Sequence, residues 1–582
     1  MKTSTRPPRA IALNVVAIAM LLAAVVPMQI AYSTPPSGTF LNQAAALLLW
    51  GAVVVLLGLR NAPPIRVALA GAAPLFAALA ILGVAAVSSG LLGRLPASMA
   101  IAALGVIAAS AVMVASGASA RGQADGARVL DAFFAAWVAA GVVSALVCMV
   151  QVFAPGWTDG LFVARSTLAG RAVGNLRQPN AVSSQLLWSA AAVLPLIDTG
   201  RLKRGLGVPL FALMLLGVVL SGSRTGMVGI ALLAAWGLAD SRLARASRAL
   251  LLSAPLWFGL FWLATSLWAS ALGHDFGGAA RFAATDPSSS RFGVWSNALS
   301  LIAHDPLAGV GFGAFNFAWV LTPFPDRPVA IFDHTHNLEL QLAVELGLPL
   351  ATLVLGLLGW ALWRAWRNCR SEPGDSGVGL RAAFVMVLTM ALHSQLEYPL
   401  WFAYFLLPTA WVWGHCLGRG PATSVASADA GRSRVPALMI AGMVMVGATG
   451  LALADYARVA RIYTAQSAGQ LAERIASGQH SVLFAHHADY AAAVTARGPA
   501  EAVQPLRQAT HFLLDPQIMV VLIKTLAAQG DLERARHVAQ RLREFRSPQA
   551  VAFLSACEAG EIQPPTFHCE APTRTLDWHD FR

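Results

Sequence analysis

Apolar runs of about 20 residues recur along this chain, and they constrain its fold more than any other feature. A helix of that length crosses the bilayer core with all its backbone N–H and C=O groups paired internally. The chain has 582 residues, of which 57% are hydrophobic and 12% are charged. Soluble proteins carry about 25% charged residues. The sequence therefore predicts an all-α, polytopic transmembrane helical bundle rather than a large soluble enzyme.

We expect about 12–13 spans, each long enough to cross a bilayer. Thirteen can be placed on the sequence, at 11–30, 40–59, 67–87, 97–116, 130–153, 181–197, 206–220, 226–240, 249–269, 338–362, 381–396, 399–417 and 435–454. The seventh and eighth are short, with a break at Ser221–Thr225 that is the hardest to place. The first run follows Lys2, Arg6 and Arg9 and resembles a signal peptide, but its length favours an uncleaved anchor.

Basic residues in the loops indicate how the spans are oriented. Twenty Lys and Arg fall in loops on the side of the N-terminus and eight on the other side, alternating along the membrane region. By the positive-inside rule, the N-terminus is cytoplasmic. The same rule accounts for the net charge of +12 without a nucleic-acid partner. Two long loops, 154–180 and 270–337, then face the outer side of the membrane.

The chain divides by composition into a membrane domain, 1–454, and a soluble tail, 455–582. An odd number of spans places the tail on the outer side of the membrane. Its apolar residues recur at helical spacing, and Leu526–Gly530 resembles the helix–turn–helix core of a tetratricopeptide repeat. Pro516 and Pro548 fall where such repeats end. We expect a helical, tetratricopeptide-like domain that either binds a partner or acts as a structural cap.

Cysteine placement leaves one question open. Of five Cys, Cys557 and Cys569 lie in the tail and would form a disulfide if that compartment is oxidising. Sequence spacing does not give the separation of their Cα atoms. A disulfide and a pair of free thiols both remain open.

The octapeptide His334–Gln341 closes the second long loop and opens an apolar span. Titratable side chains at a membrane boundary are costly, so they are functional candidates. A histidine there suits a general base, because imidazole titrates near neutral pH. Asn337, Gln341 and Glu345 follow at i, i+4 and i+8, a stripe that must face protein or water rather than lipid.

Two other interpretations of this segment remain open. In the first, His334 and His336 are ordinary loop residues beside Asn337, which only caps the helix. In the second, Asp333 joins the two histidines as a metal ligand, although no Cys or third well-spaced His supports such a site.

Four further blocks on the same side carry polar residues. Ser221–Gly226 places Arg224 between two spans, where a guanidinium suits a diphosphate or reaches lipid headgroups. Ser290–Trp295 contains Arg291 and suggests a helix lying along the interface, followed by a glycine-rich turn. The first long loop and the loop near residue 395 supply the remaining candidates: Arg165, Arg171, Asn175, Gln178, Asn180, His393, Glu397 and Tyr398.

Several catalytic motifs are missing from the sequence. It contains no Asp-x-Asp pair, P-loop, Gly-x-Ser-x-Gly or His-Glu-x-x-His. These absences weigh against a metal-dependent nucleotide-sugar transferase, an ATPase and a zinc protease.

Together these motifs resemble a known superfamily. His334-Thr335-His336-Asn337 with Gln341 and Glu345-Leu346-Gly347 resembles the signature of the O-antigen ligase and polymerase superfamily. Gly174–Asn180 and His393–Tyr404 are similar to blocks of bacterial protein O-oligosaccharyltransferases of the pilin-glycosylating type. The resemblance covers about residues 10–455, and the helical tail also fits. Arg177 stands where a glycine is commoner, which puts the exact turn there in question.

The resemblance implies transfer of a glycan from undecaprenyl diphosphate to a Ser or Thr hydroxyl of pilin or another periplasmic protein. No metal or nucleotide cofactor is implied. By this resemblance, His336 is the base and Arg224 holds the leaving diphosphate. Arg291, with Arg165 or Arg171, would hold the second phosphate, and direct attack would invert the anomeric centre.

Three alternatives stay open at this point. Two use the same chemistry: ligation of O-antigen to lipid A-core, and polymerisation of O-antigen repeats. The third belongs to a different class, a transporter or flippase of the lipid-linked glycan. Charged residues spread through mid-span positions would favour a transporter, but the polar groups of this chain gather on one side of the membrane.

Overall fold

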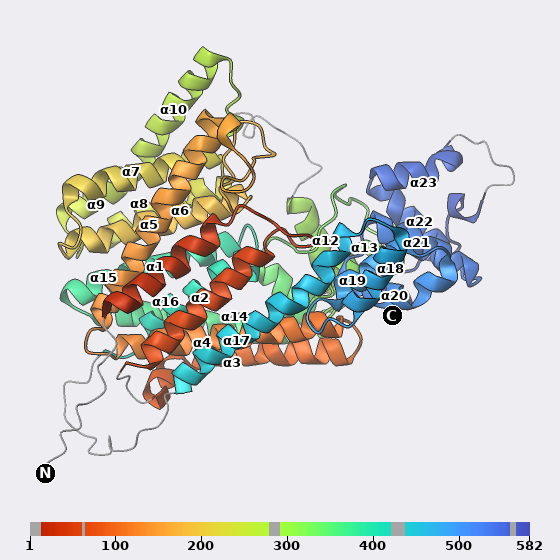
Figure 1. Ribbon diagram of the computed structural model, residues 1–582, viewed down its shortest axis with the longest axis horizontal. Helices are drawn as coiled ribbons and strands as arrows, with labels where there is room; N and C mark the ends of the chain where they lie inside the picture. Colours follow the sequence, from red (N-terminus) through yellow and green to blue (C-terminus); the bar gives the residue numbers. More distant parts are fainter. Residues whose placement is uncertain (1–12, 61–64, 279–290, 421–436, 559–565) are drawn as a thin grey trace, which may run out of the picture. The chain divides into compact units, whose positions relative to one another are not determined.

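The computed structural model describes residues 13–60, 65–278, 291–420, 437–558 and 566–582. Those residues form helices and no strand (Figure 1). The N-terminal basic residues of the expected anchor, and Arg281, Ser290, Arg432 and Arg434, lie outside the described residues.

Ten described helices, one of them extended by the turn that follows it, are long and apolar enough to cross a membrane. They are α2 (Phe40–Gly58), α3 (Ile65–Leu91), α4 (Ala97–Arg121), α5 (Gly126–Phe153), α6 (Pro179–Asp198), α7 (Arg204–Ser221), α10 (Ala254–Leu272), α14 (Leu338–Ser371), α15 (Gly374–Ser394) and α17 (Ala437–Ala460). Three predicted spans are shorter helices: α1 (Leu13–Gln29), α8 (Arg224–Ala239) and α16 (Ala403–Leu417). The predicted polytopic helical fold is confirmed.

Two span boundaries differ in detail from the simple pattern. The seventh and eighth spans separate at Gly222, a left-handed residue with φ 56° that ends α7. The predicted span 249–269 is two helices, α9 (Arg245–Leu252) and α10, which meet at Ser253. An apolar run does not mark such a junction, because both sides of it are equally hydrophobic.

The helices form two compact units, and unit 1 comprises 1–77, 108–284 and 357–451. Its core is aromatic: Trp137 lies edge-on to Trp188 at 4.7 Å between ring centroids. The Trp188 indole donates to the Met386 carbonyl at 2.8 Å. Helix α6 is almost wholly buried. A Cβ on Gly141 would lie 2.4 Å from the Ser189 Cβ, so this glycine allows α5 and α6 to pack closely.

Unit 2 comprises 78–107, 285–356 and 452–582. It joins the second long loop, with its helices α12 (Arg291–His304) and α13 (Phe315–Leu321), to the tail. Loop and tail are fastened by buried polar contacts, since Asn316 Oδ1 accepts from the Leu514 N–H at 2.7 Å. Helix α12 has apolar residues on both its buried and its exposed face, including Val294 and Phe292. Its position along the membrane interface stays a prediction.

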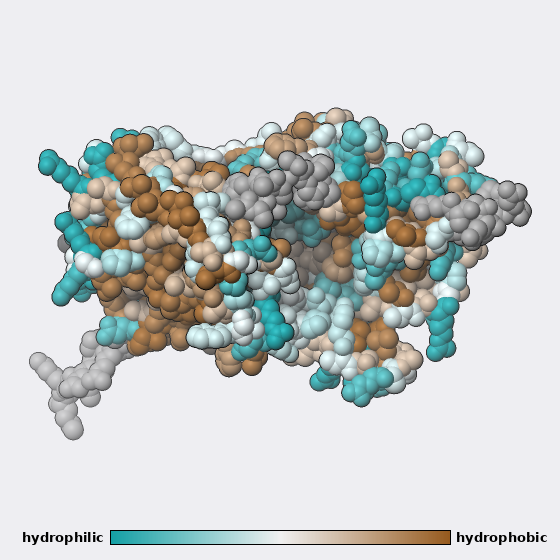
Figure 2. Space-filling model, turned by 90° about the horizontal axis from the view of Figure 1, so that it is seen from above, coloured by the Kyte–Doolittle hydropathy of each residue, from teal (hydrophilic) through white to brown (hydrophobic). Residues whose placement is uncertain are grey.

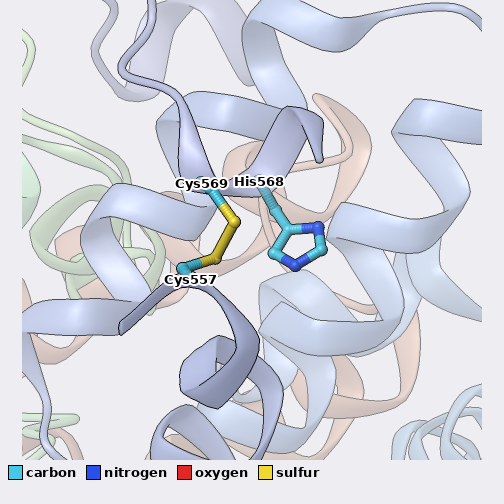
Figure 3. Close-up of side chains that lie close together, drawn as sticks. All are labelled: Cys557, His568 and Cys569. Carbon is cyan, nitrogen blue, oxygen red and sulfur yellow. A yellow bond between two sulfur atoms is a disulfide. The ribbon is translucent and has the colours of Figure 1, made fainter. Parts of the chain in front are cut away.

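The described residues of the tail form six α-helices: α18 (Ala468–Gln479), α19 (Ala485–Thr495), α20 (Pro499–Phe512), α21 (Pro516–Ala528), α22 (Leu532–Glu544) and α23 (Pro548–Glu558). The expected helix–turn–helix is present, with Gly530 at φ 82° between α21 and α22. Pro516 and Pro548 are first residues of helices, where proline lacks no needed N–H. Cys557 and Cys569 form a disulfide beside His568, with Cα atoms 5.3 Å apart (Figure 3).

The surface of the spans is apolar over wide areas (Figure 2). On α10, for example, Leu256, Leu260, Leu263 and Leu267 are all exposed and share one face of the helix. Soluble proteins rarely leave so large an apolar face uncovered. The chain is therefore a multi-pass membrane protein.

Candidate functional site

His336 lies in a strained turn just before α14. Its φ is 56°, in the left-handed region that costs a non-glycine residue about 1–3 kcal/mol. On one side Asn337 is the N-cap of α14, and its Oδ1 accepts from the Leu340 N–H at 2.9 Å. On the other side Thr335 is fully buried, and its carbonyl accepts from the Trp295 indole at 2.9 Å. The surrounding structure thus fixes a conformation that His336 would not adopt alone.

A hydrogen-bonded relay supports this turn from below. Gln341 Oε1 accepts from the Thr335 N–H at 2.8 Å, and Gln341 Nε2 donates to Glu345 Oε1 at 3.0 Å. The Glu345 carboxylate also accepts from the N–H groups of Gly313 and Phe315, at the start of α13. Gln341 and Glu345 are buried, as expected for a stripe that avoids lipid. Their polar atoms are used within the protein, so we interpret them as residues that position His336.

The kink in α14 packs against the predicted glycine-rich turn at residues 306–311. Gly347 interrupts the helix with φ 74° and ψ 163°. A Cβ there would lie 2.3 Å from the Leu307 carbonyl oxygen, so only glycine fits. The Gly311 N–H donates to the Glu345 carbonyl at 3.0 Å. The turn 306–311 therefore packs against the segment that carries Glu345.

His334 lies two residues before His336, and Arg291, 45 residues before it, belongs to the same unit. His334 Nδ1 is 2.8 Å from Asp333 Oδ1, and Asp333 is exposed. Arg291 is the first residue of α12 and is half-buried. The His336 ring lies edge-on to Phe332, with centroids 5.5 Å apart.

In unit 1, three separate sequence blocks meet around Asn180. Asn180 Nδ2 donates to Glu397 Oε1 at 2.9 Å, and Asn180 Oδ1 accepts from the Ser223 hydroxyl at 2.6 Å. Ser223 is in turn the N-cap of α8, accepting from the Gly226 N–H at 3.0 Å. Arg224 follows as the first residue of α8 and is exposed. A helix N-terminus and a guanidinium are thus presented together, as anion binding requires.

Sequence reasoning missed the role of Ser223 as the link in this network. A Ser just before a helix, with its hydroxyl accepting from the backbone N–H three residues later, is the ordinary N-cap pattern, and it was the one available signal. It does not indicate that the hydroxyl also donates to Asn180, which lies 43 residues earlier.

Two residues of the first long loop hold the loop itself. Asn175 is buried; its Oδ1 accepts from the Ala164 N–H at 2.9 Å and its Nδ2 donates to the Gln29 carbonyl at 3.0 Å. Gln178 is the N-cap of α6, accepting from the Ala181 N–H. Substrate contacts by Asn175 and Gln178 remain predictions, and in this structure their side chains organise the chain.

The arginines of the loop differ in what they contact. Arg171 Nε donates to the Ser221 carbonyl at 3.1 Å, so it fastens the loop to the turn before Arg224. Arg165 Nε donates to the Thr158 carbonyl at 3.2 Å, within an exposed part of the loop. Arg177 has φ 58°, which explains why glycine would suit that position.

The remaining candidates lie at the end of α15. His393 is buried, with its ring edge-on to Phe405 at 6.3 Å between centroids. Tyr398 is half-buried and lies beside Phe402, with centroids 5.8 Å apart. Of the candidate residues, His336 and Arg291 belong to unit 2. Arg224, Arg165 and Arg171 belong to unit 1.

Two parts of the chain match known protein families. Residues 209–355 match the family described as O-antigen ligase. We call these residues, which are similar to that family, the ligase-family region. The ligase-family region contains Arg224, Arg291, His336 and Glu345, so it includes the relay, the kink and the start of α8. Residues 381–552 match a second family, described as virulence factor membrane-bound polymerase, C-terminal.

Two curated relatives come from Acinetobacter baylyi (strain ATCC 33305 / BD413 / ADP1). A general O-oligosaccharyltransferase is 27% identical over 290 residues, covering 49% of each chain. A ComP-specific O-oligosaccharyltransferase is 23% identical over 268 residues, covering 44% of this chain and 46% of the relative. The aligned part spans about half the length of the curated relatives.

Proposed function

We propose that this protein transfers a preassembled glycan from a lipid-linked diphosphate to a hydroxyl of an acceptor protein. The observation that carries the proposal is the His336 turn in the ligase-family region. A strained residue that its surroundings over-determine is typical of a functional site. Here the strained residue is His336, whose imidazole is half-exposed. Buried, hydrogen-bonded residues hold the turn in place from below. The names of the two relatives support the reaction class.

The proposed chemistry needs two groups. The acceptor oxygen attacks the anomeric carbon, the bond from that carbon to the diphosphate oxygen breaks, and the hydroxyl proton passes to His336. Because a diphosphate is a good leaving group, the second need is fixed positive charge rather than a general acid. Arg224 at the N-terminus of α8 would supply it, with Arg291 and Arg165 as candidates for the second phosphate. Arg171 would act indirectly, by holding the turn that precedes Arg224.

The proposal includes a location and a set of partners. The loops and the tail 455–582 would face the periplasm from the inner membrane, where the membrane domain 1–454 binds an undecaprenyl-diphosphate-linked glycan. The acceptor would be Ser or Thr of pilin or another periplasmic protein, and no cofactor is invoked. His334, Asn337, His393, Glu397 and Tyr398 would line or support the substrate site.

Glycan transfer in a reconstituted strain tests this function. Cells that make a known lipid-linked glycan would receive this protein with a candidate pilin, and pilin glycosylation would be measured by mass spectrometry. We expect His336→Ala and Arg224→Ala each to lower transfer at least about 100-fold, the usual contribution of a catalytic base or a charge-stabilising group. His480→Ala, in an exposed part of the tail, is the matched control and should transfer normally. Full transfer by His336→Ala at normal expression would rule the mechanism out.

A second candidate uses the same donor with a different acceptor. The two family matches carry the descriptions O-antigen ligase and membrane-bound polymerase, which favour lipid A-core or a growing glycan as the acceptor. The same strain distinguishes the candidates. Glycan found on lipid A-core, or lengthened on its lipid carrier, with none on pilin would replace the protein acceptor in the proposal.

A further inference from the structure

Two histidines and two aspartates converge at the end of α12. His304 is the last residue of that helix and Asp305 follows it. Asp577 and His579 come from the C-terminal segment of the chain. Ligand atoms of His304, Asp305 and His579 all lie within 4.8 Å of one another. The proposed glycan transfer uses none of these side chains.

The spacing of these atoms fits metal ligands better than ion pairs. His579 Nε2 is 3.3 Å from Asp305 Oδ1, and His304 Nε2 is 3.3 Å from Asp577 Oδ2. Charge-assisted N–H···O bonds are shorter, about 2.7–2.9 Å. A tetrahedral ion with ligands about 2.0–2.1 Å away holds neighbouring ligand atoms about 3.3 Å apart.

Asp577 orients the imidazole ring of His579. His579 Nδ1 lies 3.0 Å from Asp577 Oδ1, where it donates its proton and leaves the Nε2 lone pair for an ion. A carboxylate behind a ligating histidine fixes the ring in this way at many metal sites. On the other side of the cluster, Asp305 Oδ2 is buried and accepts no hydrogen bond from the described residues.

The C-terminal segment is anchored independently of any ion. Trp578 is 1% exposed, and the Arg582 guanidinium lies 3.8 Å from the centre of its ring. Arg582 Nη2 also donates to the Val310 carbonyl at 3.1 Å. Asp577 and Asp580 form a capping box around the last helical turn. The ligands on this segment are therefore held in place before an ion binds.

We propose that His304, Asp305 and His579, with Asp577 as support or fourth ligand, bind a divalent transition metal ion of the Zn²⁺ type. Two imidazoles with carboxylate oxygens favour Zn²⁺ over Mg²⁺ and Ca²⁺, which prefer all-oxygen sites. The ion fastens the C-terminal segment to Asp305, which directly precedes the turn 306–311 that packs against Gly347. Its role is structural, and it lies outside the glycosyl-transfer chemistry.

Metal titration of the full-length protein tests the site. Protein without a polyhistidine tag would be purified in detergent under non-reducing conditions, stripped with a chelator and titrated with Zn²⁺ against a fluorescent chelator, with Mg²⁺ in parallel. We expect one Zn²⁺ per chain and no competition by Mg²⁺. His304→Gln and His579→Gln should each weaken binding at least about tenfold, and Asp577→Asn about tenfold, as loss of a supporting carboxylate usually does. Co²⁺ should give the absorption bands of a tetrahedral site.

A second group of possible metal ligands among the described residues provides a matched control. In Cys557, His568 and Cys569 the two sulfurs are bonded to each other (Figure 3), so the group lacks thiolate ligands. His568→Gln should leave Zn²⁺ binding unchanged. His304 is 59% exposed, so His304→Gln should unfold at the wild-type temperature in chelator, which separates loss of the site from loss of the fold. No Zn²⁺ binding by the wild type at micromolar concentration, or wild-type binding by both His304→Gln and His579→Gln, would overturn the proposal.

Discussion

Gln341 uses both ends of its amide, and that makes it the connecting residue of the candidate site. Its oxygen accepts from the Thr335 N–H next to His336, and its nitrogen donates to Glu345. No other ordinary side chain of similar size both accepts and donates at these two places. The geometry of the His336 turn therefore depends on a residue that lies a full helical turn away.

Replacing Gln341 with leucine should separate positioning from binding. The change leaves the buried Thr335 N–H without an acceptor, at a cost of about 1–3 kcal/mol. We expect glycan transfer to fall at least tenfold through kcat, with the KM for the lipid-linked donor little changed. Gln549→Leu, at an exposed position of α23, is the control. An unchanged kcat for Gln341→Leu would mean that the relay does not position His336.

The sequence predicted which residues are polar here, but not how they are used. Asn337, Gln341 and Glu345 share a helix face by spacing alone, and their burial was expected. The left-handed turn at His336 was not predictable, because a positive φ is uncommon for every residue other than glycine, histidine included. Arg177 is similar: the sequence indicates an unusual residue, whereas the reason, a guanidinium that donates to Asn42 Oδ1 at 3.2 Å, is a contact 135 residues away.

At the scale of single elements, α14 is two helical pieces joined at Gly347. Apolar spacing predicted one continuous span from 338, and the helix does begin at Leu338. The kink was hidden because a lone glycine in an apolar run is common in membrane helices. Its cause is the turn 306–311, which occupies the space a side chain would need.

Gly347→Ala should destabilise the protein. An alanine there combines a positive φ with a Cβ 2.3 Å from the Leu307 carbonyl, and we expect a loss of at least about 1–3 kcal/mol. Gly356→Ala is the matched control, because a Cβ at that helical position meets nothing within 4 Å. Thermal unfolding in detergent should show a lower midpoint for Gly347→Ala and an equal or higher one for Gly356→Ala. Equal midpoints for both variants would show that the kink is not required.

At the scale of the whole molecule, the order of the spans was predictable and the grouping of loop and tail was not. Hydropathy and loop charge locate membrane segments because each depends only on local composition. The contact of Asn316 with Leu514, 198 residues apart, has no local signature. The same holds for the cluster of His304 and His579, which the sequence did not suggest.

Two half-buried histidines, His487 and His511, should make the tail sensitive to acid. Burial lowers the pKa of His487 and His511 to about 4, whereas an unfolded histidine titrates near pH 6.5. Both are therefore neutral in the fold, and the stability they allow is complete above about pH 6.5 and lost as pH falls toward 4. Each should cost the fold about 1.4 kcal/mol per pH unit within that window.

Hydrogen exchange of the full-length protein would measure this effect. After correction for intrinsic exchange rates, α19 and α20 should lose protection between pH 7 and pH 5, and α5 and α6, which bury no histidine, should not. His487→Leu should reduce the loss, since leucine keeps the apolar packing and does not titrate. Protection of α19 and α20 that is independent of pH would contradict the assigned burial.

The Cys557–Cys569 bond also makes the tail a natural reporter of membrane sidedness. Such a bond persists in the periplasm and is reduced in the cytosol, so its redox state in living cells records which compartment the tail occupies. The denatured protein would be alkylated with a maleimide polymer either before or after reduction. The reduced sample would carry two more mass increments than the unreduced one only if the pair is bonded in the cell. That gel shift tests on which side of the membrane α17, the last span before the tail, ends, without a fusion protein and without changing a residue.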